Sequence, residues 1–236
     1  MEVIVCNTAD EASTLAARLL KNQIVEKKQS VLGLATGKTP LALYKKLIEI
    51  VKNENVDLTQ LTTFNLDEYV GLGKDHPQSY NSYMQKHFVK PLGLTASQFN
   101  IPDGKAEDIV KECESYEKRI QQRGPVDLQI LGIGRDGHIG FNEPGSSLGS
   151  RTRLKSLTAA TREANASEFG SADSVPRHVI TMGIQSILDS RTIALLAFGD
   201  HKAQAVAHMV EGPITAKVPA SVLQFHPRVK VFLDPG

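Results

Sequence analysis

The sequence has little of what marks secreted, membrane-bound or metal-binding proteins. Its 236 residues include only two cysteines, Cys6 and Cys113, which lie far apart and show no metal-ligand or redox spacing. Nothing in it approaches the roughly 18 consecutive apolar residues of a membrane span. The N-terminal stretch MEVIVCNTADEAS has acidic residues where a signal peptide has basic ones. We therefore expect reduced cysteines and a soluble cytoplasmic protein with no membrane partner.

The sequence also lacks an excess of charge of either sign. Lysine and arginine number 27 against 26 for aspartate and glutamate. No overall field draws such a chain toward nucleic acid or an anionic membrane. We therefore expect no nucleic-acid partner, and any anion must be bound by a local group of residues.

Short apolar runs separated by stretches of helical periodicity are the main pattern in the chain. An apolar fraction of 41% provides ample material for a core, and no linker or repeat divides the sequence. Alternating strands and helices predict an α/β fold, a doubly wound and mostly parallel sheet with helices on both faces in the Rossmann-like manner. We expect one domain over residues 1–236. The predicted strands are EVIVC, VLGLA, TTFNL, VDLQILGIG, HVITM, TIALLAF and VKVFL.

Helix ends and loops can be placed on the same pattern. Thr8 and Glu11 have the spacing of a capping box, and a second helical stretch ends in basic residues followed by Gly124. The largest irregular region runs from Gly134 to about Pro176. Loops of that length inside a compact domain are usually functional. We expect a lid over an active site at about residues 154–175.

The stretch VLGLATGKTPLALYKKL, residues 31–47, resembles a nucleotide-binding loop but is one residue short of it. No strand offers a convincing aspartate for the magnesium ion that such loops use. A strand-to-helix turn with proline in the first helical turn still directs backbone N–H groups outward and can bind one small anion. The alternative is an ordinary glycine-containing turn. The candidate anion ligands are Thr36, Gly37, Lys38 and Thr39.

Two further strands end in polar signatures. Asp67 and Glu68 follow TTFNL, and GIGRDGHIGFNEP follows VDLQIL. Ligands of open α/β sheets bind beyond the carboxyl ends of the strands, so the three signatures should meet. A histidine beside a carboxylate suits general acid/base catalysis. Acids after a strand are otherwise most often solvated or capping groups. The second signature contains Asp136, His138 and Glu143, and it also contains four glycines: Gly132, Gly134, Gly137 and Gly140.

Metal and serine-hydrolase chemistry are disfavoured by spacing. Asp136 and His138 lack a second imidazole at helical spacing, so we expect no metal. No Gly-x-Ser-x-Gly elbow is present. Lys202 stands in the first turn of a helix after TIALLAF, against the helix dipole, which an anion shared with the 36–39 turn would explain. A surface lysine in a tolerant position is the alternative.

Taken together, these motifs make the chain resemble the glucosamine-6-phosphate deaminase (isomerase) family, in a short form. The strongest are LGLATGKTPLALYKKL, TTFNLDEYVGL, LGIGRDGHIGFNEPGSSLGSRTR and VPRHVITMGIQSILDSR. The Gly-x-Gly-x-Asp-Gly-His element also occurs in the related 6-phosphogluconolactonases. Asp67-Glu68-Tyr69 together with Phe141-Asn142-Glu143-Pro144 distinguishes the deaminases.

The resemblance implies conversion of glucosamine 6-phosphate and water to fructose 6-phosphate and ammonia, in amino-sugar catabolism and without a cofactor. His138 would assist ring opening, with Asp136 and Glu143 setting its orientation and charge. Asp67 would move a proton from C2 to C1. The remaining substrate-binding residues would be Thr36, Gly37, Lys38, Thr39, Glu68, Gly137 and Lys202.

One departure concerns the phosphate. Family members commonly have an arginine in the closing loop, where this chain has Ser167. Lys38 and Arg162 are candidates to replace that bidentate clamp. Two rival functions remain: a 6-phosphogluconolactonase, which the Asp67 and Glu143 signatures disfavour, and a non-catalytic sugar-phosphate sensor. The sensor is disfavoured because no helix-turn-helix segment precedes the domain and every proposed catalytic residue is present.

The second departure is length, since some relatives extend further and complete an allosteric site for N-acetylglucosamine 6-phosphate. Ser146, Ser147, Arg153 and Lys155 match the core of that site, but the chain stops at Gly236. We predict weak or no activation by the acetylated sugar. A substrate saturation curve that N-acetylglucosamine 6-phosphate sharpens strongly would contradict this. Both a monomer and a homo-oligomer are compatible with the sequence.

Overall fold

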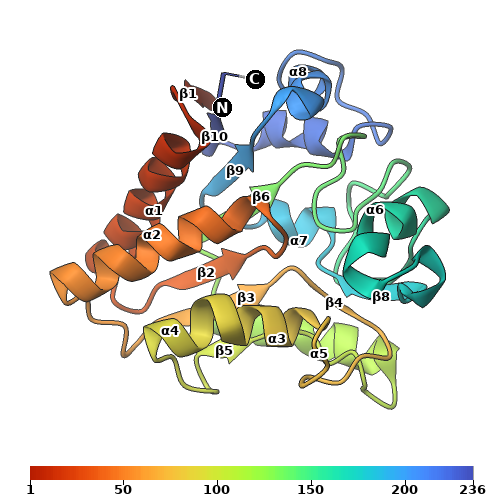
Figure 1. The fold of residues 1–236 in the computed structure, drawn as a ribbon, viewed down its shortest axis with the longest axis horizontal. Helices are drawn as coiled ribbons and strands as arrows, with labels where there is room; N and C mark the ends of the chain where they lie inside the picture. The colour runs from red at the N-terminus through yellow and green to blue at the C-terminus, as the bar shows by residue number, and fades with distance from the viewer. Residues whose placement is uncertain (236) are drawn as a thin grey trace.

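The computed structural model describes residues 1–235 and is built on a seven-stranded sheet (Figure 1). Every neighbouring pair in this sheet is parallel, in the order β1-β10-β9-β6-β2-β3-β5. The predicted α/β fold is therefore confirmed. The strands are β1 (Glu2–Val5), β2 (Val31–Leu34), β3 (Thr62–Asn65), β5 (Phe99–Asn100), β6 (Leu128–Gly132), β9 (Ile193–Ala197) and β10 (Val229–Leu233).

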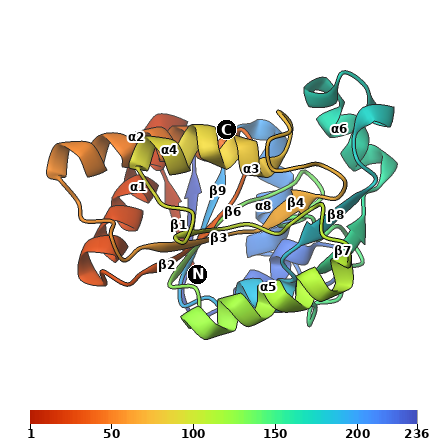
Figure 2. The ribbon, with the colours of Figure 1, turned by 90° about the horizontal axis from the view of Figure 1, so that it is seen from below.

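Helices cover both faces of this sheet. Figure 2 shows α2, α3 and α4 on one face and α5 on the other, and α1 packs against α2. The central strands β2 and β9 are buried throughout, as parallel strands between two helical layers must be. The helices are α1 (Ala9–Glu26), α2 (Thr39–Glu54), α3 (Tyr80–Met84), α4 (Lys90–Leu92), α5 (Ile109–Arg123), α7 (Ile184–Leu188) and α8 (Ala203–Val210), with a π-helical turn, Gln85–Val89, joining α3 to α4.

Several local predictions are confirmed by the capping geometry. The Thr8 hydroxyl accepts a hydrogen bond from the backbone of Glu11, and α5 ends at Gly124. Cys6 and Cys113 are buried free thiols. No helix between residues 1 and 235 combines the length and the apolar content that a bilayer crossing demands.

A second, three-stranded antiparallel sheet lies beside the main one. It consists of β4 (Asp67–Tyr69), β8 (His178–Thr181) and β7 (Arg153–Ser156), in the order β4-β8-β7. The predicted strand HVITM therefore exists, but it belongs to this small sheet rather than to the main one. Its partner β4 follows β3 after a single residue, so the chain passes from one sheet to the other at Leu66.

The region expected to be irregular between Gly134 and Pro176 contains regular structure. Besides β7 it forms helix α6 (Ala159–Phe169) and a short 3-10 turn, Ala172–Ser174. Thr158 caps the start of α6 and Gly170 ends it in the left-handed region. The helix buries no residue completely, so its sequence lacks the apolar stripe by which a helix is recognised.

The order of the strands creates a crevice at the centre of the sheet. Strands β2 and β6 are neighbours, yet the chain continues from them to opposite sides of the main sheet. The next strand of this sheet after β2 is β3, on one side, and the next after β6 is β9, on the other. Loops that follow these two strands must diverge, which opens space above their carboxyl ends. In Figure 1, α6 stands beyond this edge of the sheet.

A glycine close to β4 gives a test of this architecture. A Cβ atom at Gly104 would lie 2.0 Å from the carbonyl oxygen of Tyr69, whereas one at Gly73 would meet nothing within 4 Å. We predict that Gly104→Ala lowers the free energy of unfolding by about 1–3 kcal/mol because the backbone of β4 must shift. Gly73→Ala is the matched control and should change it little. Equal urea midpoints for the two variants would contradict the prediction.

Candidate active site

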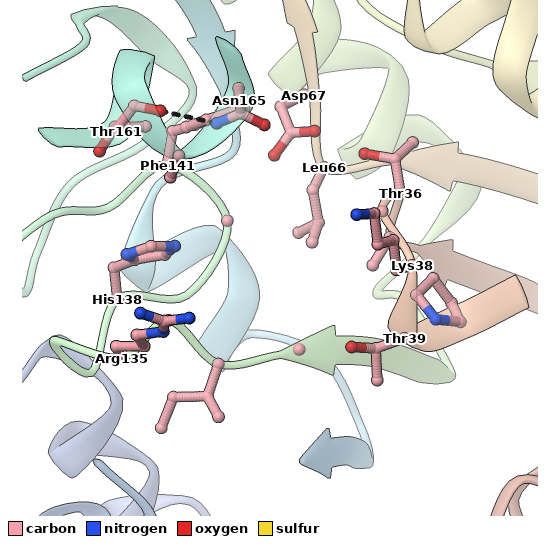
Figure 3. A pocket seen from close by; sticks show the side chains of 18 of the residues that line it. Thr36, Lys38, Thr39, Leu66, Asp67, Arg135, His138, Phe141, Thr161 and Asn165 are labelled. Atoms are coloured by element: carbon pink, nitrogen blue, oxygen red, sulfur yellow. Dashed lines mark hydrogen bonds between the residues drawn. The ribbon is translucent and has the colours of Figure 1, made fainter. Parts of the chain in front are cut away.

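A cavity of about 690 Å³ occupies the crevice at the carboxyl ends of β2, β3 and β6. Helix α6 closes one side of it through Thr161 and Asn165, which Figure 3 shows beside Phe141. Eight of the residues predicted to form the site line this cavity: Thr36, Gly37, Lys38, Thr39, Asp67, Asp136, His138 and Lys202. The three strand-end signatures therefore meet, as the sequence predicts. Glu68, Gly137 and Glu143 do not line it.

Asp67 is a buried carboxylate that faces the cavity. It opens β4, and its side chain is only 5% exposed. Figure 3 shows it directed into the same space that His138 faces from the left. Burial, and secondarily the charge of Glu68, raise the pKa of Asp67 to about 8. A carboxyl group with such a pKa can accept and hold a proton near neutral pH.

Glu68 has a different role from the substrate binding that we predicted. Successive residues of a strand point to opposite faces, so its side chain leaves the cavity where that of Asp67 enters. One carboxylate oxygen accepts from the backbone N–H groups of Tyr69 (2.8 Å) and Tyr80 (2.9 Å), and the other accepts from Asn81 (2.8 Å). Burial raises the pKa of Glu68 to about 7 despite these bonds. Glu68 therefore anchors the start of α3.

His138 and Asp136 form an oriented acid/base pair. The Nδ1 atom of His138 lies 2.6 Å from Oδ1 of Asp136, which also accepts from the His138 backbone at 3.2 Å. The hydrogen bond with His138 holds the pKa of Asp136 below its usual value. Since Nδ1 is engaged, Nε2 is the ring nitrogen left for a substrate. A Cβ atom at Gly134 would lie 2.2 Å from the ring, so glycine there makes room for the imidazole.

Glu143 forms no hydrogen bond or ion pair with His138 among the described residues, and its predicted influence on the charge of His138 stays a prediction. Its buried carboxylate accepts hydrogen bonds from the hydroxyl groups of Thr158, at 2.8 Å, and Thr161. Both threonines belong to the first turn of α6 or its cap. Glu143 therefore connects α6 to the segment that follows His138, whereas the hydrogen bond to the imidazole comes from Asp136.

Gly137 shapes the same loop from outside the cavity. Its φ of 81° lies in the left-handed region, and a Cβ atom would meet Val218 at 2.6 Å. Its N–H donates to the carbonyl of Gly134 at 3.0 Å, closing the turn before His138. A side chain at this position would displace the turn, which accounts for the glycine without any contact to a ligand.

Three cationic residues line the cavity: Lys38, Arg135 and Lys202. Lys202 donates from Nζ to the carbonyl of Ile133 at 2.7 Å, which fixes it at the end of β6. Burial and the neighbouring Arg135 lower the pKa of Lys202. We call this set, with the turn Thr36–Thr39, the anion subsite. Arg135 was not predicted, although it stands inside the glycine-rich signature.

Of the two residues offered as substitutes for the missing arginine, only Lys38 lines the cavity. Arg162 instead donates to the carbonyl of Ala172 at 3.3 Å, within the segment that follows α6. Ser167 is exposed and lies outside the cavity lining. Lys38, Arg135 and Lys202 are therefore the cations in the cavity lining that are available to an anion.

Aromatic side chains line and support one wall of the cavity, a role that the sequence analysis did not predict although Tyr69 and Phe141 lie within its motifs. Tyr80 and Phe141 line it, and their rings stack with centroids 6.2 Å apart. Tyr69 contacts both of these rings and also Phe169 at the end of α6, with centroids 5.3 Å apart in the last case. These residues come from four separate segments, so only the fold brings them together.

Metal-ligating side chains do not cluster within the described part of the chain. Across residues 1–235, no three histidine, cysteine, aspartate or glutamate side chains gather in a way that could hold a metal ion.

Comparison with known proteins identifies the family of this chain. Residues 6–231 match the family described as glucosamine-6-phosphate isomerases/6-phosphogluconolactonase. A glucosamine-6-phosphate deaminase of Thermoanaerobacter pseudethanolicus is 48% identical over 99% of this chain and 92% of its own length. A solved structure described as a monomeric glucosamine-6-phosphate deaminase has 48% identity and a TM-score of 0.97, covering 100% of this chain and 98% of its own.

The other branch of the family shares the fold at much lower identity. The 6-phosphogluconolactonase of Thermotoga maritima has a TM-score of 0.78 at 20% identity, covering 99% of each chain. The chain therefore belongs to the family of glucosamine-6-phosphate isomerases and 6-phosphogluconolactonases.

Proposed function

We propose that this protein is a glucosamine-6-phosphate deaminase, which converts glucosamine 6-phosphate and water reversibly to fructose 6-phosphate and ammonia. The observation that carries the proposal is the buried Asp67, which shares one cavity with the His138–Asp136 pair and with the anion subsite. The identity of 48% to proteins of that name over nearly the whole chain supports the same substrate.

His138 opens the sugar ring. Its Nε2 accepts the proton of the anomeric hydroxyl group and returns a proton to the ring oxygen. Asp136, hydrogen bonded to Nδ1, stabilises the imidazolium formed between these two transfers. The orientation of the ring is fixed before substrate arrives, so little reorganisation is needed during the step.

Asp67 carries out the isomerisation. It removes the C2 proton of the open-chain sugar while the substrate's ammonium group passes a proton to the C1 oxygen, which leaves an enolamine, and it then returns the proton to C1. Water then adds to the resulting imine at C2, and ammonia leaves. One carboxylate can serve both carbons because they are adjacent. The raised pKa of Asp67, about 8, lets the carboxyl group keep the proton between the two transfers.

The anion subsite holds the 6-phosphate at the far end of the sugar. The N-terminus of α2 has no capping side chain, so its first N–H groups and its dipole are available to an anion. Lys38, Arg135 and Lys202 add positive charge around it. Two cations from the strand loops thus replace the clamp that an arginine at Ser167 would supply.

Helix α6 and its flanking turns, about residues 154–175, act as the lid of this single domain. Glu143 and Phe169 hold the two ends of α6 against the site. We place the enzyme in the cytoplasm, where its free cysteines stay reduced. The monomeric relative supports a monomer here as well.

The lactonase reaction is the weaker candidate. It needs one activated water and no proton transfer between carbons, so a second buried carboxylate with a raised pKa would have no task in it. Asp67 therefore favours the deaminase.

We predict that Asp67→Asn lowers kcat for ammonia release by about 100- to 10,000-fold, because the amide cannot accept the C2 proton. Ammonia and fructose 6-phosphate are measured together, in the presence of EDTA. Asp75→Asn, in an exposed loop, is the matched control and should keep wild-type activity. A wild type that releases no ammonia would exclude the proposed function, and the next substrate to test would be 6-phosphogluconolactone.

The loss of activity should not reflect unfolding. A carboxyl group whose pKa is raised in the folded state binds more protons folded than unfolded between about pH 4 and pH 8, so the stability of the wild type declines as pH rises through that window. Asp67→Asn removes this cost, and its thermal midpoint at pH 8 should equal or exceed that of the wild type.

The same raised pKa predicts the pH dependence of kcat/KM. The base must be deprotonated in the free enzyme, so kcat/KM should fall as pH drops below about 8. Glu68→Gln removes the neighbouring negative charge and should move this acid limb to lower pH. A limb near pH 4, the ordinary range of an aspartate, or one that does not move in the variant would contradict the assignment.

A further inference from the structure

Three backbone N–H groups of the anion subsite have no acceptor in the protein. Within residues 1–235, the N–H groups of Thr36, Gly37 and Lys38 donate to no backbone or side-chain oxygen, and α2 has no capping side chain. Such groups bind an anion only if they point toward it. The rotation of the peptide planes in this turn therefore decides how well the subsite works.

Two tyrosine hydroxyl groups fix two of these planes. Tyr44 donates from Oη to the carbonyl of Ala35, and Tyr83 donates to the carbonyl of Gly37, each at 2.6 Å. All peptide bonds in the described chain are trans. In a trans peptide the C=O and the following N–H point in opposite directions. Tyr44 thus sets the direction of the Thr36 N–H, and Tyr83 sets that of the Lys38 N–H.

Gly37 makes the second of these restraints necessary. It has a φ of 102°, and nothing lies within 4 Å of the place where a side chain would begin. Glycine in open space rotates freely, because neither its own side chain nor a neighbour restricts it. Among the described contacts, the hydroxyl group of Tyr83 is the restraint on the carbonyl of Gly37.

The helix that contains Tyr83 is hydrogen bonded to β4, the strand that begins with Asp67. Tyr83 belongs to α3, and the buried carboxylate of Glu68 accepts from the N–H groups of Tyr80 and Asn81 at the start of that helix. Glu68 follows Asp67 directly in β4. A short series of hydrogen bonds therefore runs from the strand of the proposed base, through α3, to the turn that faces the phosphate.

We propose that Tyr83 is a positioning residue of the anion subsite: its hydroxyl group fixes the Gly37–Lys38 peptide with the Lys38 N–H turned toward the 6-phosphate. This inference rests on the proposed function for the identity of the anion. A role in packing alone is the competing explanation, because the ring of Tyr83 also lies 4.9 Å from that of His87. Packing would change stability without changing the affinity for phosphate.

The test compares Tyr83→Phe with Tyr116→Phe. The hydroxyl group of Tyr116 donates to the carbonyl of Asn65 at 2.7 Å, so the control loses the same kind of bond at a carbonyl outside residues 36–39. Binding of inorganic phosphate is measured by titration calorimetry, and KM and kcat are measured with glucosamine 6-phosphate. We expect Tyr83→Phe to raise both the dissociation constant of phosphate and KM by about 3- to 10-fold, the worth of one hydrogen bond, with kcat nearly unchanged.

The outcomes separate this inference from the proposed function. Unchanged phosphate affinity in Tyr83→Phe, or an equal loss in Tyr116→Phe, would overturn the positioning role, whatever the thermal midpoints of the variants. Weaker phosphate binding in Tyr83→Phe alone would support it. Because calorimetry with inorganic phosphate requires no turnover, a wild type that binds phosphate but releases no ammonia would overturn only the proposed reaction.

Discussion

The burial of a carboxylate at the junction of two sheets is the constraint on which the site depends. Asp67 stands where the chain passes from the parallel sheet to the small antiparallel one, and it is 5% exposed. Burying an acid raises its pKa and costs stability, unless other groups compensate. Here the stability cost of burying Asp67 is not offset, whereas the carboxylate of its neighbour Glu68 accepts hydrogen bonds from three backbone N–H groups. Two adjacent acids in one strand thus have different surroundings: Asp67 faces the cavity, whereas Glu68 accepts hydrogen bonds at the start of α3.

The crevice brings the residues of two diverging loops into one cavity. His138 and Asp136 come from the loop after β6, whereas Thr36–Thr39 and the N-terminus of α2 follow β2. These strands are neighbours whose connections run in opposite directions, so their loops face each other across the opening.

Helix α6 completes the site through contacts that are polar at one end and aromatic at the other. Glu143 accepts from the threonine hydroxyl groups at its start, and Phe169 packs on Tyr69 at its end. Because α6 buries no residue completely, it is held over the cavity by these few contacts, including the packing of Phe169 on a small hydrophobic cluster. An element fixed in this way belongs to the least stable part of a fold, which suits a segment that must admit substrate.

The sequence by itself determined six of the seven strands of the main sheet, the ends of two of its helices at Thr8 and Gly124, and the three signatures that meet at the cavity; it did not predict β5 and did not assign HVITM to the small sheet. These features depend on the order of apolar and turn-forming residues along the chain, and parallel strands necessarily bring their carboxyl ends together. Tertiary structure alone decided which side chains in those signatures face the cavity. Glu68 points away from the cavity because side chains alternate along β4. Glu143 forms hydrogen bonds with α6 rather than with His138, and Arg135, in the loop after β6, lines the cavity. The direction of a side chain depends on the groups that surround it in the folded protein, and the spacing of residues along the sequence does not specify those groups.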